Sequence, residues 1–184
     1  MRLCVFCGSK TGDDPRFSQA AIETGTLLAK RGIGVVYGGG RVGLMGVLAD
    51  AARAAGGEVI GVIPQSLAER EVAHSGLSQL HVVESMHERK ALMAELSAGF
   101  IALPGGFGTF EEFCEVITWS QLGIHTKPCG VLNVAGYFDN LIAMFDYAVE
   151  RGFISAANRE IVLESEQPDE LIDRMLKLTE VGLR

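Results

Sequence analysis

Short apolar runs alternate along the chain with longer segments in which apolar residues recur at helical spacing. The apolar runs are nearly unbroken, which is typical of strands that are buried on both faces of a parallel sheet. The pattern predicts strands at Leu3–Cys7, Gly34–Tyr37, Glu58–Ile63, Leu80–Val83, Phe100–Leu103 and Gly130–Val134, with a further short strand at Ile161–Leu163. It predicts helices at Phe17–Lys30, Val42–Ala55, Met86–Ala98, Thr109–Leu122, Phe138–Glu150 and Asp169–Leu178.

This alternation indicates an α/β fold with a doubly wound, mostly parallel sheet and helices on both faces. A length of 184 residues favours a single domain over residues 1–184. No linker, repeat or low-complexity segment interrupts the pattern, which favours the same conclusion. Ligands of such folds bind beyond the carboxyl ends of the strands. The segments at these positions are Gly8–Ser9, Gly38–Gly40, the residues after Pro64, and Pro104–Gly106.

Composition limits the classes of partner. With 48% hydrophobic and 21% charged residues the chain is globular in makeup, and its net charge of −7 argues against nucleic acid or anionic membranes as partners. No apolar stretch approaches the ~18 residues of a membrane span, and the apolar start is too short for a signal peptide. We therefore expect a cytoplasmic protein, in which a local site can still oppose the global charge and bind a small anion.

The cysteines and histidines suggest no metal or redox chemistry. Cys4 and Cys7 form a C-x-x-C within a strand-like run, whereas redox motifs of this kind stand at the start of a helix. Cys114 and Cys129 supply no second C-x-x-C, and the four histidines lack metal-ligand spacing. Four scattered, buried thiols and no bound metal are the expected outcome.

The first glycine cluster, Gly38–Gly43, matches G-x-G-x-x-G between a predicted strand and a predicted helix, a context suited to phosphate. A dinucleotide site also needs an acidic residue at the end of the next strand, but that strand ends at Pro64, and Glu58 opens it. We therefore reject NAD and keep a mononucleotide or a sugar phosphate as the ligand. The alternative is a tight turn that binds nothing.

The second cluster, Pro104–Glu112, also joins a strand to a helix and carries the sequence P-G-G-F-G-T-F-E-E. Successive glycines leave backbone N–H groups free to converge on an anion, and the helix dipole adds positive charge. Thr109 and Glu112 also match the capping box T-x-x-E, with Thr109 as N-cap and Glu112 at N3, which needs no chemistry. These two interpretations are about equally supported by the segment alone.

A third segment, Ser85–Lys90, contains a capping box in which Ser85 begins a helix and Glu88 follows at N3. Arg89 and Lys90 then fall just inside the helix, where cations oppose the dipole. A broken local rule without a local gain often marks a functional site. The alternative is a solvated basic pair that Glu88 partly neutralises.

Met86-His87-Glu88-Arg89-Lys90, followed by Pro104–Glu112, completes the patterns M-x-x-R-K and P-G-G-x-G-T-x-x-E. On these residues the chain resembles the "Lonely Guy" (LOG) family of cytokinin-activating enzymes, which older descriptions label "possible lysine decarboxylase". The likeness spans nearly the whole chain, from Cys7-Gly8-Ser9 to Trp119–Gly123. It implies a Rossmann-like fold, a homodimer, and hydrolysis of cytokinin riboside 5′-monophosphates, with AMP as a further candidate, to free base and ribose 5-phosphate.

The resemblance also implies roles for individual residues. Arg89 and Glu112 match the catalytic pair of the family. With the strand-end segments included, the substrate-binding positions are Ser9, Gly39, Gly40, Glu71, Lys90, Gly105, Gly106, Phe107, Gly108, Thr109, Phe110, Glu111 and Thr118. Lys10 departs from the family, because many relatives have a second serine after Ser9.

Cleavage of an N-glycosidic bond passes through a sugar cation, by analogy with glycoside hydrolases. A carboxylate at Glu112 would stabilise that cation or activate water, and no cofactor is needed. Pyridoxal chemistry is disfavoured, because Lys90 is the only lysine beside the motifs and it follows an arginine. The alternative from another class is a non-catalytic carrier of nucleotides or molybdenum cofactor, a role that relatives of this fold perform.

Overall fold

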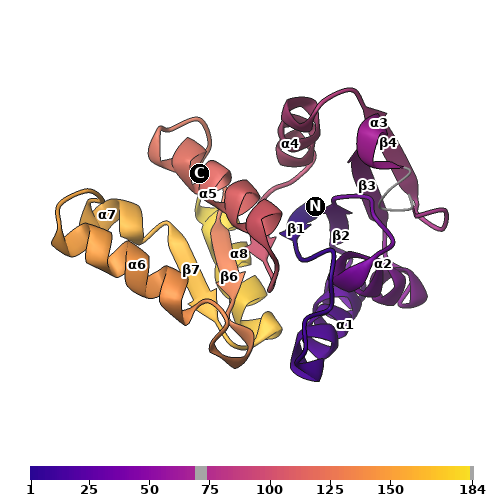
Figure 1. The fold of residues 1–184 in the computed structure, drawn as a ribbon, viewed down its shortest axis with the longest axis horizontal. Coiled ribbons are helices and arrows are strands. Elements are labelled where there is room, and N and C mark those ends of the chain that lie inside the picture. Colours follow the sequence, from indigo (N-terminus) through magenta and orange to yellow (C-terminus); the bar gives the residue numbers. More distant parts are fainter. Residues whose placement is uncertain (69–73, 183–184) are drawn as a thin grey trace.

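The computed structural model describes residues 1–68 and 74–182. Seven parallel strands form one sheet in the order β4-β3-β2-β1-β5-β6-β7 (Figure 1). They are β1 (Arg2–Phe6), β2 (Gly34–Tyr37), β3 (Val59–Pro64), β4 (Gln79–Val83), β5 (Phe100–Ala102), β6 (Cys129–Leu132) and β7 (Val162–Ser165). The strand order reverses where β1 meets β5, with Cys4 opposite Phe100, and this reversal is the topological switch point of the sheet.

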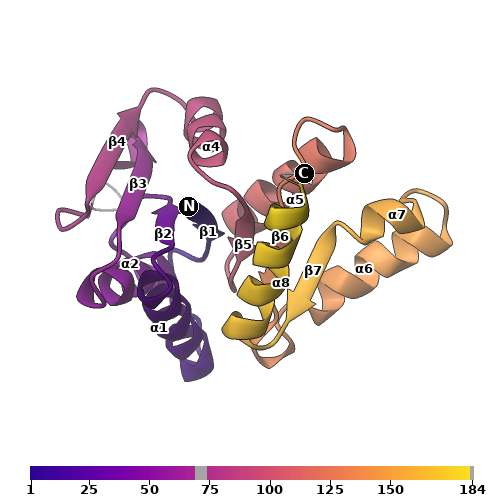
Figure 2. The same cartoon turned by 180° about the vertical axis from the view of Figure 1, so that it is seen from behind.

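Helices cover both faces of the sheet, which confirms the predicted doubly wound α/β architecture (Figures 1 and 2). One face carries α1 (Pro15–Lys30), α2 (Gly43–Ala54) and α8 (Pro168–Gly182), and the other carries α4 (Met86–Glu95), α5 (Phe107–Gln121) and α6 (Asp139–Glu150). Three short pieces complete the described chain: α3 (Gln65–Ala68), a 3₁₀ turn η1 (Val134–Gly136) and α7 (Ala156–Arg159). The apolar pattern of the sequence does not predict these three.

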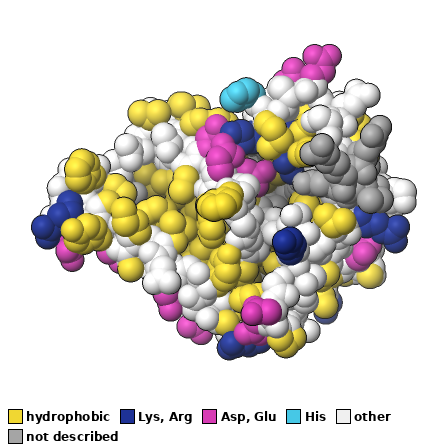
Figure 3. Space-filling model, in the orientation of Figure 1, with side chains coloured by type: hydrophobic (Ala, Val, Ile, Leu, Met, Phe, Trp, Pro, Cys, Tyr) yellow, Lys and Arg dark blue, Asp and Glu magenta, His cyan; other side chains and the backbone are white. Residues whose placement is uncertain are grey.

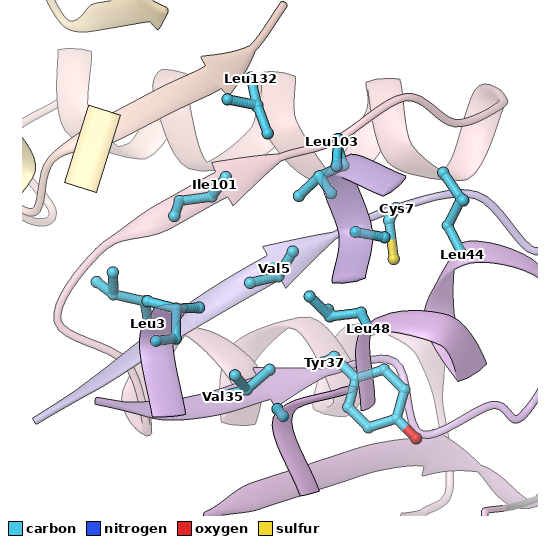
Figure 4. Packing of buried hydrophobic residues seen from close by; sticks show 14 of the residues in the cluster. Leu3, Val5, Cys7, Val35, Tyr37, Leu44, Leu48, Ile101, Leu103 and Leu132 are labelled. Atoms are coloured by element: carbon cyan, nitrogen blue, oxygen red, sulfur yellow. The ribbon is translucent and has the colours of Figure 1, made fainter. Parts of the chain in front are cut away.

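The strands are buried on both faces because their side chains alternate between two apolar layers. In β1, Leu3 and Val5 pack under α1 and α2, beside Leu48, whereas Cys4 and Phe6 belong to the layer under α4 and α5 (Figure 4). This arrangement explains why β1 reads as a continuous apolar run with no polar face.

The starts of the helices follow local capping rules, with one correction. Ser85 begins α4 as predicted, because its Oγ accepts the N–H of Glu88 at 3.1 Å. The predicted N-cap at Thr109 is wrong: Gly106 is the N-cap of α5, and the helix begins at Phe107. Thr109 and Glu112 therefore lie inside the helix, and Glu112 cannot act as the N3 partner of a capping box.

The described residues contain no helix that is long and apolar enough to cross a membrane. All four cysteines are free thiols. Cys4, Cys7 and Cys129 are buried as expected, while Cys114 is only half-buried. Burial raises the pKa of the Cys129 thiol to about 12, and burial together with the charge of Glu112 raises the pKa values of Cys4 and Cys7 well above the ordinary range. The buried thiols therefore stay protonated at neutral pH.

Candidate functional site

The candidate site lies at the switch point, where the loops after β1 and β5 meet. The N–H of Gly8, which follows β1, donates to the carbonyl of Pro104, which follows β5, at 3.0 Å. Gly8 and Gly105 approach so closely that a Cβ on Gly8 would lie 3.2 Å from the Cα of Gly105. The crossing of these two loops divides the carboxyl edge of the sheet into two adjoining cavities.

The smaller cavity, called here the Arg89 cavity, has a volume of about 180 Å³. Its lining is Val5, Phe6, Cys7, Gly8, Ser9, Gly38, Met45, Arg89, Gly106, Phe107, Gly108, Thr109 and Glu112. The larger one, called the Tyr137 cavity, has a volume of about 340 Å³. Its lining is Gly8, Ser9, Lys10, Thr11, Gly12, Phe17, Leu44, Pro104, Gly105, Gly106 and Tyr137.

Arg89 reaches from the first turn of α4 to the ends of the central strands. Its Nε donates to the carbonyl of Val62 at 3.1 Å, and its Nη2 donates to the carbonyl of Gly38 at 3.2 Å. Its Nη1 lies 3.6 Å from Oε1 of Glu112 on α5, and both side chains are buried. Tertiary folding thus brings the two residues of the predicted catalytic pair together, although they come from different sequence motifs.

Glycine at position 38 is a steric requirement of this arrangement. A Cβ at Gly38 would lie 2.0 Å from Nη2 of Arg89. Any other residue would force the buried guanidinium away from the carbonyl that it binds and from Glu112.

The start of α5 presents a set of exposed backbone groups to the Arg89 cavity. Its N-cap, Gly106, provides no side chain, and a Cβ at Gly106 or at Gly108 would meet nothing within 4 Å. By contrast, a Cβ at Gly105 would lie 2.1 Å from Oγ1 of the buried Thr109. The first N–H groups of a helix are available to an anion, so this end of α5 is suited to hold a phosphate.

The first glycine cluster serves packing instead. The N–H of Leu44, at the start of α2, already donates to the carbonyl of Gly8 at 3.0 Å. A Cβ at Gly43 would lie 2.2 Å from the backbone of Ser9. These contacts favour the alternative of a tight turn over a second phosphate site. Glu58 forms an ion pair with Arg2 at 2.8 Å, at the amino end of β3 and away from the cavities, in keeping with the rejection of NAD.

Lys90 connects α4 to α5. Its ammonium group forms ion pairs with Glu111 and, at 3.0 Å, with Glu115, and its side chain is only 10% exposed. Burial lowers the pKa of Lys90, but its hydrogen bonds to the two carboxylates raise it more, so the pKa lies above the ordinary value. A lysine that forms a Schiff base must lose its proton, and Lys90 therefore does not fit that role.

The remaining predicted positions divide into two groups. Ser9, Gly106, Phe107, Gly108 and Thr109 line the Arg89 cavity, and Gly105 lines its neighbour. The other positions lie outside both linings. Phe110 packs on Phe138, and the exposed Thr118 donates to the carbonyl of Cys114. The carbonyl of Gly39 accepts the N–H of His74, and Gly40 is buried. Glu71 lies outside the described residues.

Sequence reasoning missed several residues of the site, notably Met45 and Tyr137. Tyr137 follows β6, and the rule that sites lie beyond the carboxyl ends of strands would have found it if applied to that strand too. Met45 gives no such signal, because its role depends on how α2 packs. Among the described residues, no group of three or more His, Cys, Asp or Glu side chains could hold a metal ion.

The fold and the site define a Rossmann-like α/β protein in which a glycine-rich helix start without a side-chain cap lies at the switch point of the sheet. Among solved structures, a molybdenum cofactor binding protein from Rippkaea orientalis matches with a TM-score of 0.72 and 22% identity, over 96% of each chain. The molybdenum cofactor carrier protein from Chlamydomonas reinhardtii matches with a TM-score of 0.72 and 20% identity, over the same shares. At these identities the likeness shows the fold alone.

Sequence relatives are much closer. The family model described as "Possible lysine decarboxylase" matches residues 45–175. The cytokinin riboside 5′-monophosphate phosphoribohydrolase LOG1 of Arabidopsis thaliana is 51% identical over 174 residues, which cover 95% of this chain and 82% of the relative. LOG2 of the same plant is 48% identical over 171 residues, which cover 93% and 80%. The chain belongs to this family, which confirms the resemblance inferred from its motifs.

The position of Lys90 leads to a prediction about stability. Lys90→Met removes both ion pairs between α4 and α5, and we expect it to lower the free energy of unfolding of the ligand-free protein by about 1–3 kcal/mol. Thermal unfolding measures this change. Arg151→Met is the control, since its pair with Glu150 is exposed at 3.8 Å. If Lys90 serves only to bind nucleotide, both variants will unfold like the wild type.

Proposed function

We propose that this protein is a phosphoribohydrolase that cleaves the N-glycosidic bond of cytokinin riboside 5′-monophosphates, with AMP as a further substrate. The observation that carries the proposal is the buried pair of Arg89 and Glu112, 3.6 Å apart, beside the uncapped start of α5. The start of α5 suits the negative charge of a phosphate, and the carboxylate of Glu112 suits the positive charge that develops on the sugar. The names of the LOG relatives support the same activity and substrate class.

The 5′-phosphate is bound by the first backbone N–H groups of α5, next to Ser9 across the Arg89 cavity. The helix dipole favours a dianion here, and the open space around Gly106 and Gly108 lets its oxygens approach the backbone closely. The hydroxyl of Thr109, on the same turn, is available as a further donor. The phosphate thereby fixes the ribose in relation to Glu112, which lies one turn further along α5.

Glu112 is the residue that faces the anomeric carbon. As the bond to the base breaks, positive charge develops on the ribose ring, and a buried carboxylate stabilises that charge more than an exposed one. Arg89 orients this carboxylate, because its own guanidinium is held by the carbonyls of Val62 and Gly38. Arg89 is therefore a fixed group in the site, with little freedom to follow a mobile phosphate.

The alternative of a non-catalytic carrier is supported less well. It rests on solved structures about 20% identical to this chain, whose likeness extends to the fold only. A carrier of an anionic cofactor gains nothing from a carboxylate such as Glu112 within the anion site, since like charges repel. The family model is described as "Possible lysine decarboxylase", and a pyridoxal-dependent form of that reaction is opposed by the paired state of Lys90.

We also propose a homodimer and a reducing compartment such as the cytoplasm. Free thiols at all four cysteines support the compartment. The dimer is supported by α6, in which no residue is buried, and by exposed apolar side chains on this helix and just after it, among them Met144 (60%) and Phe153 (87%). Figure 3 shows the hydrophobic surface gathered over the half of the molecule that holds α5, α6 and α7. A second copy of the chain would cover it.

Glu112→Gln tests the assignment of the carboxylate. The amide keeps the shape and removes the charge, so we expect kcat for base release from AMP to fall about 100- to 1000-fold. Arg89 keeps its two carbonyl partners but loses its buried countercharge, so we also expect the free energy of unfolding to fall by about 3–5 kcal/mol. Product analysis and thermal unfolding give the two readouts, with Glu95→Gln on α4 as the control. Base release by Glu112→Gln at near the normal rate would refute the proposed role.

The requirement for the 5′-phosphate is tested with matched substrates. We expect kcat/KM for AMP to exceed that for adenosine by at least about 100-fold, the value of two charge-assisted hydrogen bonds. Inorganic phosphate and ribose 5-phosphate should both inhibit competitively. Equal kcat/KM values for the two substrates would exclude the start of α5 as the phosphate site.

The dimer is tested by sedimentation velocity at micromolar concentration. We expect a dimer for the wild type and a monomer for Met144→Glu, because the new charge would be buried in the interface. Leu178→Glu is the matched control, an exposed leucine on α8 on the opposite face of the sheet. A monomeric wild type, or dissociation by the control and not by Met144→Glu, would contradict the proposed interface.

A further inference from the structure

The turn after β6 holds an unusual backbone conformation. Ala135 has φ 56° and ψ 27°, and it is the one non-glycine residue with positive φ in the described ranges. Gly136 follows with φ 72°. An alanine in the left-handed region costs free energy, so the rest of the structure must hold it there.

Two hydrogen bonds from the side chain of Asn133 help to fix the turn in this conformation. Its Nδ2 donates to Oδ1 of Asp139 at 2.7 Å, and its Oδ1 accepts the N–H of Phe138 at 2.8 Å. The N–H of Tyr137 donates to the carbonyl of Val134 at 3.0 Å, which closes the turn. The chain is thereby fixed on both sides of Tyr137, and the conformation of Ala135 sets the direction in which Tyr137 leaves the turn.

The ring of Tyr137 is exposed on one side and contacts aromatic side chains from three segments. Its centroid lies 5.5 Å from that of Phe17 on α1 and 5.1 Å from that of Phe138, both edge-to-face. Phe110 of α5 stacks against it at 6.4 Å. The hydroxyl at the end of this ring donates to the carbonyl of Gly105. Tyr137 therefore connects the β6–α6 turn to the loop that precedes α5.

That bond fixes a peptide plane of the proposed phosphate site. In a trans peptide the C=O and the following N–H point in opposite directions, so the hold on the carbonyl of Gly105 directs the N–H of Gly106 away from Tyr137. The carbonyl of Pro104 is held by Gly8 and that of Gly106 by the N–H of Phe110, at 3.0 and 3.1 Å. A Gly-Gly segment has no side chains that restrict its backbone conformation, and these three hydrogen bonds restrict it instead.

We infer that Tyr137 is a positioning residue: its hydroxyl holds the Gly105–Gly106 peptide so that the N–H groups at the start of α5 are set for the phosphate. This inference rests on the proposed function for the identity of the ligand. It assigns to a residue outside the family motifs a role in binding the phosphate, and none in the bond cleavage itself.

Tyr137→Phe tests the inference, because it keeps the ring contacts and removes only the hydroxyl. We expect the Kd of ribose 5-phosphate, measured by calorimetry, and the KM of AMP to rise about three- to tenfold, the value of one hydrogen bond. The kcat should stay within about twofold, and amide hydrogen exchange of Gly106 and Phe107 should become faster without ligand. Tyr147→Phe, an exposed tyrosine on α6, is the control.

A second pair of variants perturbs the same contact from the turn. Ala135→Gly accepts the left-handed conformation and should behave like the wild type, whereas Ala135→Val, β-branched, should reproduce Tyr137→Phe with the hydroxyl still present.

Unchanged Kd and exchange in Tyr137→Phe would overturn the inference, and so would a lowered melting temperature without a change in Kd. If the wild type binds ribose 5-phosphate but releases no base, the proposed reaction fails while the binding and exchange measurements still decide on Tyr137.

Discussion

Arg89 and Glu112 carry opposite charges into the interior at the carboxyl edge of the sheet, and each charge is tolerable there only because of the other and of backbone partners. Two carbonyls, at the ends of β2 and β3, accept hydrogen bonds from the guanidinium of Arg89, and Glu112 supplies the countercharge. The pair requires α4 and α5 to pack on the same face of the sheet, within reach of each other's long side chains, and Lys90 joins the same two helices again. The geometry of the site is thus the geometry of this packing, fixed before any ligand arrives.

The two glycine clusters look alike in sequence and differ in what they do. At α2, the glycines let the helix start lie against the loop after β1, and its amide groups are used by Gly8. At α5, Gly105 is required by the closeness of Thr109, while Gly106 and Gly108 adjoin open space. Glycine content alone cannot tell these cases apart, because both need a backbone without side chains. Only the tertiary neighbours decide whether the vacated space is filled by protein or left for a ligand.

The order of strands and helices was predictable, since burial on both faces of the sheet leaves an unmistakable apolar pattern. The start of α5 was not, because the T-x-x-E pattern at Thr109 satisfies the local capping rule and only the extended backbone of Gly106 shows where the helix begins. The meeting of Arg89 with Glu112 likewise depends on how two helices pack, which no local pattern encodes. Family motifs supplied that pairing, but they also suggested Thr118, whose hydroxyl the structure places on the backbone of its own helix.

The pairing of β1 with β5 has a consequence for biosynthesis. β1 is synthesised before the other strands of this sheet. Its neighbour β2 follows early, but its other neighbour, β5, comes only after α4 has been made, with Cys4 opposite Phe100. Until then one edge of β1 stays open to pairing with other chains. The pairing of β1 with β5 closes a long loop, and the entropy is lost before any contact between the strands stabilises the product. This pairing is therefore a slow step of folding. Until β5 is synthesised, a strand that is central in the finished sheet is therefore an edge strand exposed to aggregation.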